Sequence, residues 1–83
     1  MLTIKVLGPG CANCLAVERL VRKAASTLGV EARIEKVTQF PEITKYAIIA
    51  TPGLVVNEKV VCAGRIPSEA EVTTFLANAL ESS

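Results

Sequence analysis

The chain of 83 residues has no histidine and no tryptophan, and its aromatic residues are two phenylalanines and one tyrosine. Without histidine there is no imidazole base, which excludes Ser-His and Cys-His nucleophile pairs. The commonest metal ligand is missing for the same reason. So few aromatic rings leave little for a surface on which nucleobases could stack. Any chemistry in this sequence must therefore come from other side chains.

An excess of one charge sign is also absent, because nine basic and eight acidic residues give a net charge of +1. This balance provides no electrostatic attraction for nucleic acid or for an anionic membrane, so we expect neither as a partner. No apolar run approaches the roughly 20 residues of a transmembrane helix. The residues from Met1 to Lys5 lack the pattern of a signal peptide. We therefore expect a cytoplasmic protein.

Hydrophobic residues make up 51% of the chain and charged residues 20%, which is typical of a globular protein rather than a disordered one. This length suffices for one small domain over residues 1–83 and leaves no room for a second. A domain of this size buries only roughly 60–65% of its unfolded surface, so we expect modest stability.

Hydrophobic periodicity in the first half of the chain predicts a strand, a helix and a second strand. Residues 2–7 alternate with period two. Apolar residues between Val17 and Leu28 recur at helical spacing, and Gly29 stands where a helix should end. Residues 30–37 alternate again, with one charged face that is typical of an edge strand.

The second half predicts a short helix, a hairpin and a last helix. Pro41 suits the first turn of the short helix, whose inward side would hold Ile43, Tyr46 and Ala47. Strands are expected at 54–56 and 60–63, and the short connection at 57–59 makes them antiparallel. Ser68 and Glu71 form an S-x-x-E capping box at the start of the last helix.

The order of elements is therefore β-α-β-α-β-β-α, which predicts an α/β fold with a mixed four-stranded sheet between helices. The first βαβ unit requires a parallel pair of strands with a right-handed crossover. We expect the first and last helices, which have the longest apolar stripes, to lie together on one face of the sheet. The short middle helix would cover the other face, toward which Lys5 would point.

Two of the three cysteines, Cys11 and Cys14, form a C-x-x-C motif where the first strand leads into the first helix. Unpaired amides and about half a positive charge at a helix N-terminus stabilise a thiolate, and the thiolate is the attacking species in thiol chemistry. Cys14 follows by almost one helical turn, close enough to form a disulfide with Cys11. The motif predicts thiol–disulfide exchange, in which Cys11 attacks a substrate disulfide and Cys14 resolves the mixed disulfide.

The same two cysteines leave other interpretations open. Two thiolates at this spacing also suit a soft metal ion or a metalloid, as in heavy-metal-associated domains. Those domains continue as βαββαβ, whereas this chain predicts a helix between its second and third strands. A structural zinc site needs four ligands, more than one copy of this chain offers. An interaction module in which the cysteine pair has no chemical role is the third interpretation.

Three motifs together make the chain resemble the small thioredoxin-like redox-active disulfide proteins of archaea and bacteria. They are GPGCANC at residues 8–14, Thr51-Pro52, and GRIPS at residues 64–68. The resemblance covers nearly the whole chain and implies a minimal thioredoxin-like fold. It also implies that the redox group is a disulfide between Cys11 and Cys14, with no further cofactor.

The resemblance implies a substrate groove as well. In that family the Thr51-Pro52 peptide bond would be cis, Thr51 would offer its backbone to an extended substrate segment, and Gly10 and Gly64 would line the groove. The partners would be a disulfide-bearing protein or small molecule and an external reductase or thiol reductant. One departure is that the first strand holds no acid that could take a proton from Cys14, so we expect Cys14 to resolve mixed disulfides more slowly than in full-length thioredoxins.

Four other residues carry weaker signals. Cys62 is expected to be a small buried side chain rather than a regulatory or dimerising thiol. Tyr46 is expected to pack in the core rather than over the disulfide. Lys5 either influences Cys14 or is exposed to solvent, and Arg65 either steers an acidic partner or is a solvated loop charge.

Overall fold

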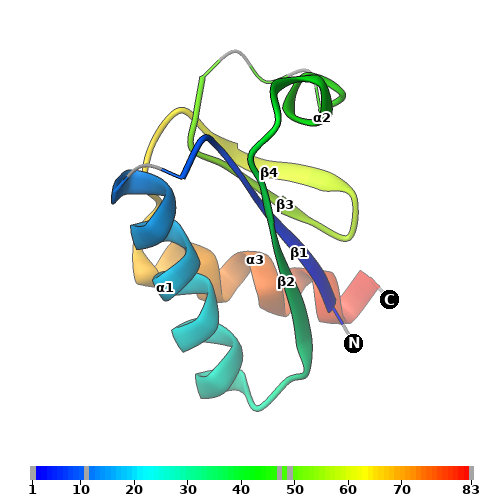
Figure 1. Cartoon of the computed structure of the whole chain (residues 1–83). Coiled ribbons are helices and arrows are strands. Elements are labelled where there is room, and N and C mark those ends of the chain that lie inside the picture. Colours follow the sequence, from blue (N-terminus) through cyan, green and yellow to red (C-terminus); the bar gives the residue numbers. More distant parts are fainter. Residues whose placement is uncertain (1, 11, 47, 49, 83) are drawn as a thin grey trace.

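The computed structural model describes residues 2–10, 12–46, 48 and 50–82. Within these residues the elements follow one another as β-α-β-α-β-β-α, which confirms the predicted order (Figure 1). Their bounds are β1 Leu2–Leu7, α1 Ala12–Leu28, β2 Ala32–Val37, α2 Phe40–Thr44, β3 Gly53–Val56, β4 Lys59–Ala63 and α3 Glu69–Ser82.

The strands form one four-stranded mixed sheet in the order β2-β1-β3-β4. β1 and β2 run parallel, as a crossover through α1 requires. β3 runs antiparallel to both β1 and β4. β2 is an edge strand, as its charged face predicted, and β1 lies inside the sheet with a neighbour on each side.

Helices cover the two faces of the sheet unequally. α1 and α3 lie together on one face, whereas α2 lies on the other, near one end of the strands (Figure 1). The larger core forms between the sheet and the two long helices, and the smaller one holds Leu7, Ile43 and Val55. Because side chains alternate along a strand, β1 sends Ile4 and Val6 into the larger core and turns Lys5 to the α2 side.

β2 begins two residues later than the alternation predicted. Gly29 has φ of +68°, in the left-handed region that favours glycine after a helix. The N–H of Gly29 donates to the carbonyl of Ser26, and the N–H of Val30 donates to the carbonyl of Ala25. This pair of hydrogen bonds is the Schellman motif, which satisfies carbonyls at the end of a helix. Val30 is therefore committed to capping α1, and pairing with β1 starts at Ala32.

The hairpin turn is also shorter than predicted. Only Asn57 and Glu58 lie between the strands, with φ of +49° and +68°, and Lys59 already belongs to β4. Two residues of positive φ are what a type I′ turn requires, and this turn matches the twist of the paired strands. The alternation of apolar residues located the hairpin but not the residues that turn the chain.

The short helix and the last helix begin where the sequence placed them. Pro41 stands in the first turn of α2, and Ile43 is its buried residue. At α3 the Glu71 N–H donates to Ser68 Oγ, and the Ser68 N–H donates to a Glu71 carboxylate oxygen, both at 3.1 Å. This confirms the capping box. Ala47, predicted to face inward, lies outside the described residues.

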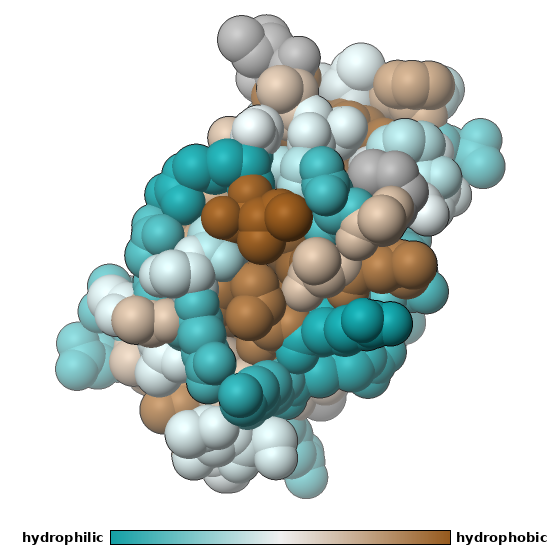
Figure 2. Space-filling view, turned by 90° about the vertical axis from the view of Figure 1, so that its left-hand side faces the viewer, coloured by the Kyte–Doolittle hydropathy of each residue, from teal (hydrophilic) through white to brown (hydrophobic). Residues whose placement is uncertain are grey.

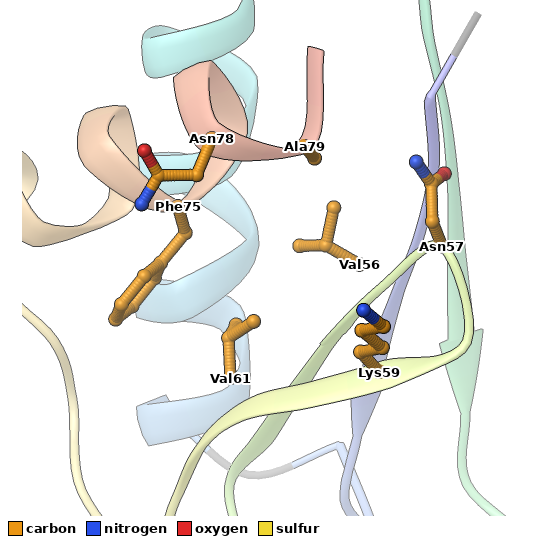
Figure 3. A pocket seen from close by; sticks show the side chains of 7 residues that line it. All are labelled: Val56, Asn57, Lys59, Val61, Phe75, Asn78 and Ala79. Atoms are coloured by element: carbon orange, nitrogen blue, oxygen red, sulfur yellow. The ribbon is translucent and has the colours of Figure 1, made fainter. Parts of the chain in front are cut away.

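Among the helices that the structure describes, none has both the length and the apolar character needed to cross a membrane. A pocket of about 390 Å³ opens between the β3–β4 hairpin and α3 (Figure 3). Its lining residues are Val56, Asn57, Lys59, Val61, Phe75, Asn78 and Ala79. They do not include the cysteines or the segment around Thr51, so this pocket is separate from the site described next.

Candidate functional site

Cys14 lies in the first turn of α1, with its side chain turned into the core. Only 5% of the residue is exposed, and it packs in the larger core together with Val6 and Val17. Cys11 lies outside the described residues, and Ala12, which follows it, is the first residue of α1. The C-x-x-C motif thus spans the start of this helix, where backbone amides and the helix dipole favour negative charge.

Gly8 allows three segments of the chain to meet at Cys14. The Gly8 N–H donates to the carbonyl of Val37 at 2.9 Å, which ties the end of β1 to the end of β2. A β-carbon on Gly8 would overlap the sulfur of Cys14, and the same point lies 3.7 Å from Cβ of Thr51. Only a residue without a side chain lets α1, β1 and the segment at Thr51 approach so closely.

The Thr51-Pro52 peptide bond is cis. Thr51 is exposed, whereas Pro52 is buried. The carbonyl of Pro52 accepts a hydrogen bond of 2.9 Å from the N–H of Gly64. Gly64 has φ of +79°, and a β-carbon there would lie 3.2 Å from Cβ of Ala50. Thr51 therefore lies beside Gly8 and Cys14, and Gly64 reaches the same segment through Pro52.

A pocket of about 240 Å³ lies on the β2 side of Cys14. It is lined by residues from β1, the loop after it, α1 and the end of β2: Val6, Gly8, Gly10, Cys14, Leu15, Glu18, Lys36 and Thr38. Gly10, which the resemblance implies to line a substrate groove, is one of the residues that line this pocket. Leu15 is 40% exposed at its rim.

The face of the molecule on which α1 lies carries apolar side chains near its centre, with hydrophilic side chains around them (Figure 2). Leu15 from α1 and Ile66 from the loop before α3 are among the large apolar residues that stay exposed.

Glu18 is the acidic residue of this pocket, one helical turn after Cys14. Its carboxylate accepts hydrogen bonds from Arg22 at 2.8 and 3.1 Å and forms an ion pair with Lys36 at 3.2 Å. Only 12% of the Glu18 side chain is exposed. The Arg22 hydrogen bonds, supported by Lys36, hold the pKa of Glu18 below its usual value. The pocket wall therefore carries a fixed carboxylate beside an ammonium group.

Lys5 does not reach Cys14, contrary to one of the two roles considered for it. Its ammonium group donates to Tyr46 Oη and to a Glu58 carboxylate oxygen, both at 2.8 Å, on the opposite face of the sheet. The Tyr46 hydroxyl in turn donates to Glu58 at 3.1 Å. Hydrogen bonds to Glu58 and Tyr46 raise the pKa of Lys5, and the Lys5 hydrogen bond lowers the pKa of Glu58. Tyr46 packs against the smaller core and also completes this polar network.

Arg65 is a solvent-exposed loop residue, as one of its two predicted roles requires, and its charge is paired within the chain. Its guanidinium donates to both carboxylate oxygens of Glu71, at 2.6 and 3.0 Å. These hydrogen bonds, together with the one from the Ser68 N–H, lower the pKa of Glu71 to about 2. Cys62 is buried in the larger core, as predicted, and its thiol lies 3.9 Å from the carbonyl of Arg65. Cys62 belongs to β4, which is separated from β1 by β3.

Groups of three or more histidine, cysteine, aspartate or glutamate side chains that could hold a metal ion do not occur among the described residues. The possible role of Cys11 and Cys14 as a two-thiolate metal site is not addressed by this finding, because Cys11 is not among those residues.

The geometry defines a class of small α/β proteins in which a cysteine in the first turn of a helix, Cys14, lies near a cis proline segment. The family profile described as Thioredoxin domain matches residues 2–77. The chain is 35% identical over 77 residues to a thioredoxin of Methanothermobacter thermautotrophicus, an alignment that covers 93% of this chain and 100% of the relative. It is 37% identical over 81 residues to a thioredoxin of Methanocaldococcus jannaschii, covering 98% and 93%.

Solved structures agree on the fold. The germline-specific thioredoxin Deadhead of Drosophila melanogaster aligns with a TM-score of 0.64 and 20% identity, over 93% of this chain and 79% of that one. Thioredoxin 1 of Thermosipho africanus aligns with a TM-score of 0.59 and 19% identity, over 96% of both chains. The chain belongs to the Thioredoxin domain family, a family of thiol–disulfide oxidoreductases, and its fold is thioredoxin-like.

Three residues of the site were not singled out by the motifs. Gly8 belongs to the GPGCANC motif but was given no role of its own, although its closeness to Cys14 explains why glycine stands there. Glu18 belongs to no motif, yet its spacing of four from Cys14 already placed both on one face of the helix. Lys36 carried no local signal, because only the parallel pairing of β1 and β2 brings it to this pocket.

Proposed function

We propose that this protein is a thiol–disulfide oxidoreductase with Cys11 as the nucleophile and Cys14 as the resolving thiol. The Cys11 thiolate attacks a substrate disulfide, forms a mixed disulfide and releases the first substrate sulfur as a thiolate. Cys14 loses its proton and attacks the Cys11 sulfur, and the second substrate sulfur leaves with the electron pair and takes up a proton. The substrate gains two electrons, and the protein is left with a Cys11–Cys14 disulfide.

The observation that carries this proposal is the position of Cys14 in the first turn of α1, packed against Gly8 beside Thr51. A buried resolving thiol is kept from outside disulfides but stays near its partner across the helical turn. The neighbouring Cys11, at the very start of the helix, would be the thiol that substrates meet. Membership in the Thioredoxin domain family supports the same chemistry.

Thr51 is the residue proposed to bind the substrate backbone. It is exposed, and among the described residues neither its N–H nor its carbonyl has a hydrogen-bond partner. An extended segment running past Cys11 could pair with both groups, as in strand addition. Gly64, held beside this segment by its bond to Pro52, would leave room for that backbone.

The substrates would be disulfides of proteins or small molecules, and an external reductase or thiol would restore the dithiol. A cytoplasmic location is part of the proposal, because a reducing compartment keeps such a pair reduced between turnovers. No further cofactor takes part in the proposed cycle.

A redox titration of metal-free protein in dithiothreitol buffers, with free thiols labelled and counted by mass, tests the proposal. We expect a reversible transition of two thiols, Cys11 and Cys14, with a midpoint in the roughly −270 to −120 mV range of related dithiols. The Cys62→Ala variant is the control and should show the same midpoint. Absence of an intramolecular disulfide, with thiols protected only on adding a soft metal ion, would favour metal binding instead.

A further inference from the structure

The pocket between the β3–β4 hairpin and α3 has no part in the proposed redox chemistry, yet it has an apolar wall and a polar end. Its volume of about 390 Å³ lies at the small end of the roughly 300–1,000 Å³ that is usual for ligand pockets. The apolar side chains come from β3, β4 and α3, and the hairpin turn and the start of β4 supply polar ones (Figure 3). A molecule that fits must be small and must combine an apolar body with a polar group.

A β-bulge adds an apolar side chain to the wall of this pocket. β4 has one residue more than β3 between two neighbouring pairs of the hairpin, and this extra residue is Val61. Bulges redirect a side chain, and Val61 packs at the edge of the larger core together with Phe75 and Ala79 of α3. All three residues stay partly exposed. An apolar group in the pocket would bury them further, which is favourable.

The polar end of the pocket offers hydrogen-bond donors. The side-chain oxygen of Asn57 accepts a hydrogen bond of 3.0 Å from the N–H of Thr3. Among the described residues nothing bonds to the amide nitrogen of Asn57, and Figure 3 shows this nitrogen on the pocket side of the residue. The bond to Thr3 therefore holds Asn57 in an orientation that presents N–H groups to the pocket.

Lys59 adds a positive charge close to these donors. Its side chain lines the pocket (Figure 3), and within residues 2–10, 12–46, 48 and 50–82 it belongs to no ion pair. The described part of the chain also contributes no acidic side chain to the lining. Glu58, the adjacent acid in the sequence, is bound to Lys5 and Tyr46 on the opposite face of the sheet. The charge of Lys59 is thus not balanced at the pocket, which favours an anionic ligand.

We propose that this pocket binds a small monocarboxylate with an apolar body, such as a medium-chain fatty acid. The carboxylate accepts hydrogen bonds from Asn57 Nδ2 and from the ammonium group of Lys59, and the apolar body lies against Val61, Phe75 and Ala79. An anion without an apolar body leaves the wall uncovered and binds more weakly. This inference goes beyond the proposed function and does not depend on it, because the pocket shares no residue with the cysteine site.

The test is a titration of the ¹⁵N-labelled full-length protein with octanoate, followed by ¹H–¹⁵N NMR spectra at constant pH and ionic strength. We expect saturable shifts of the amide resonances of residues 56–61 and 75–79. Acetate has the same charged group without the chain, and it should cause no saturable shifts of these resonances. Octan-1-ol has the chain without the charge and serves as the probe of the apolar wall alone.

Two substitutions at the polar end separate charge from shape. Lys59→Met removes the charge and should weaken octanoate binding about two- to fivefold, as for the loss of one exposed ion pair. Asn57→Asp keeps an oxygen for the N–H of Thr3 and suits the hairpin turn, but it replaces the donors by a negative charge and should weaken octanoate binding at least as much. Neither should change the affinity for octan-1-ol. Lys45→Met removes a lysine charge from α2, on the other face of the sheet, and is the matched control.

Val61→Thr makes the apolar wall more polar with little change of shape, so it should weaken the binding of octanoate and octan-1-ol alike. Far-UV circular dichroism verifies that each variant is folded. Loss of octanoate affinity in Lys59→Met and Asn57→Asp, with Lys45→Met unaffected, supports the inference. Shifts that do not saturate, that centre on the pocket beside Cys14, or that respond equally to Lys45→Met overturn it. The redox titration of the cysteine pair is a separate measurement, so either proposal can fail without the other.

Discussion

Gly8 lies so close to Cys14 that a β-carbon on Gly8 would overlap the cysteine sulfur. This contact joins the end of β1 to the first turn of α1 at the residue proposed to resolve the mixed disulfide. Thr51 borders the same point, because its Cβ lies 3.7 Å from the position that a β-carbon on Gly8 would take. The glycine is therefore required by packing around the sulfur as well as by its position in a loop.

Replacing Gly8 by alanine should disturb the site in a way that replacing Gly10 does not. The Gly8→Ala methyl group must displace the Cys14 sulfur, and such overpacking costs about 1–3 kcal/mol of unfolding free energy. It should also slow disulfide formation by the C-x-x-C pair. Gly10→Ala is the comparison, because Gly10 has φ of +90° but open space around it, so a methyl group there strains the backbone without meeting the Cys14 sulfur. Urea unfolding and the redox titration measure both effects, and normal disulfide formation in Gly8→Ala would contradict the expectation.

The roles proposed for the two cysteines predict different products from two serine variants. Cys14→Ser leaves the nucleophile without a resolving thiol, so it should accumulate a mixed disulfide with a disulfide substrate. Cys11→Ser should abolish exchange, since Cys14 is buried against the core. Non-reducing mass spectrometry after incubation with oxidised glutathione measures both. Trapping by Cys11→Ser but not by Cys14→Ser would reverse the assignment, and Cys62→Ala is the control.

Acid should remove the stabilisation that Glu71 provides at the start of α3. The pKa of Glu71 is lowered to about 2 by Arg65 and the Ser68 N–H, from an ordinary value of 4.5. A carboxyl group with a lowered folded-state pKa contributes its full stability above its unfolded pKa and loses it as the pH falls toward the folded value. Glu71→Gln should therefore unfold at lower urea concentration than the unchanged protein at pH 7.

The difference between Glu71→Gln and the unchanged protein should shrink between about pH 4.5 and pH 2 and be nearly gone at pH 2. Urea midpoints measured across this interval test the expectation. Glu81→Gln makes the same charge change near the other end of α3 and serves as the control. A difference for Glu71→Gln that does not depend on pH would show that the carboxylate charge is not what stabilises the helix start.

Lys5 should matter for stability and not for the chemistry of the cysteines. Its ammonium group joins β1 to Tyr46 and to Glu58 in the hairpin turn, and 21% of the side chain is exposed. Lys5→Met should lower the melting temperature by a few degrees and leave the redox midpoint unchanged. Lys23→Met, which breaks a more exposed ion pair with Glu69, should have a smaller effect. A change of redox midpoint in Lys5→Met would show that this lysine does act on the site.

The sequence by itself determined the order of elements, the helix that starts at the cysteine pair and the capping box of the last helix. Each of these depends on residues close together in the chain: an alternation of two, a stripe at helical spacing, or a polar side chain that caps nearby amides. The motif at Cys11 and Cys14 is local in the same sense, so the proposed chemistry could be stated before any fold was known.

Element boundaries depended on hydrogen bonds that periodicity does not contain. Val30 continues the alternation of β2, but its N–H caps α1, and the strand starts after it. Lys59 was placed in the hairpin turn, yet Asn57 and Glu58 make that turn alone. In both cases the boundary is set by the backbone conformation where two elements meet, and the alternation of apolar residues carries no information about that conformation.

The tertiary structure alone decided what surrounds Cys14. Gly8, Thr51 and Lys36 come from segments far apart in the chain, and the sheet pairing brings them to one helix turn. Lys5 shows the reverse case, because it is near the cysteines in sequence but the pleat of β1 turns it to the other face. Local patterns determine which residues can react, whereas the packing of distant segments determines which charges and backbone groups those residues meet.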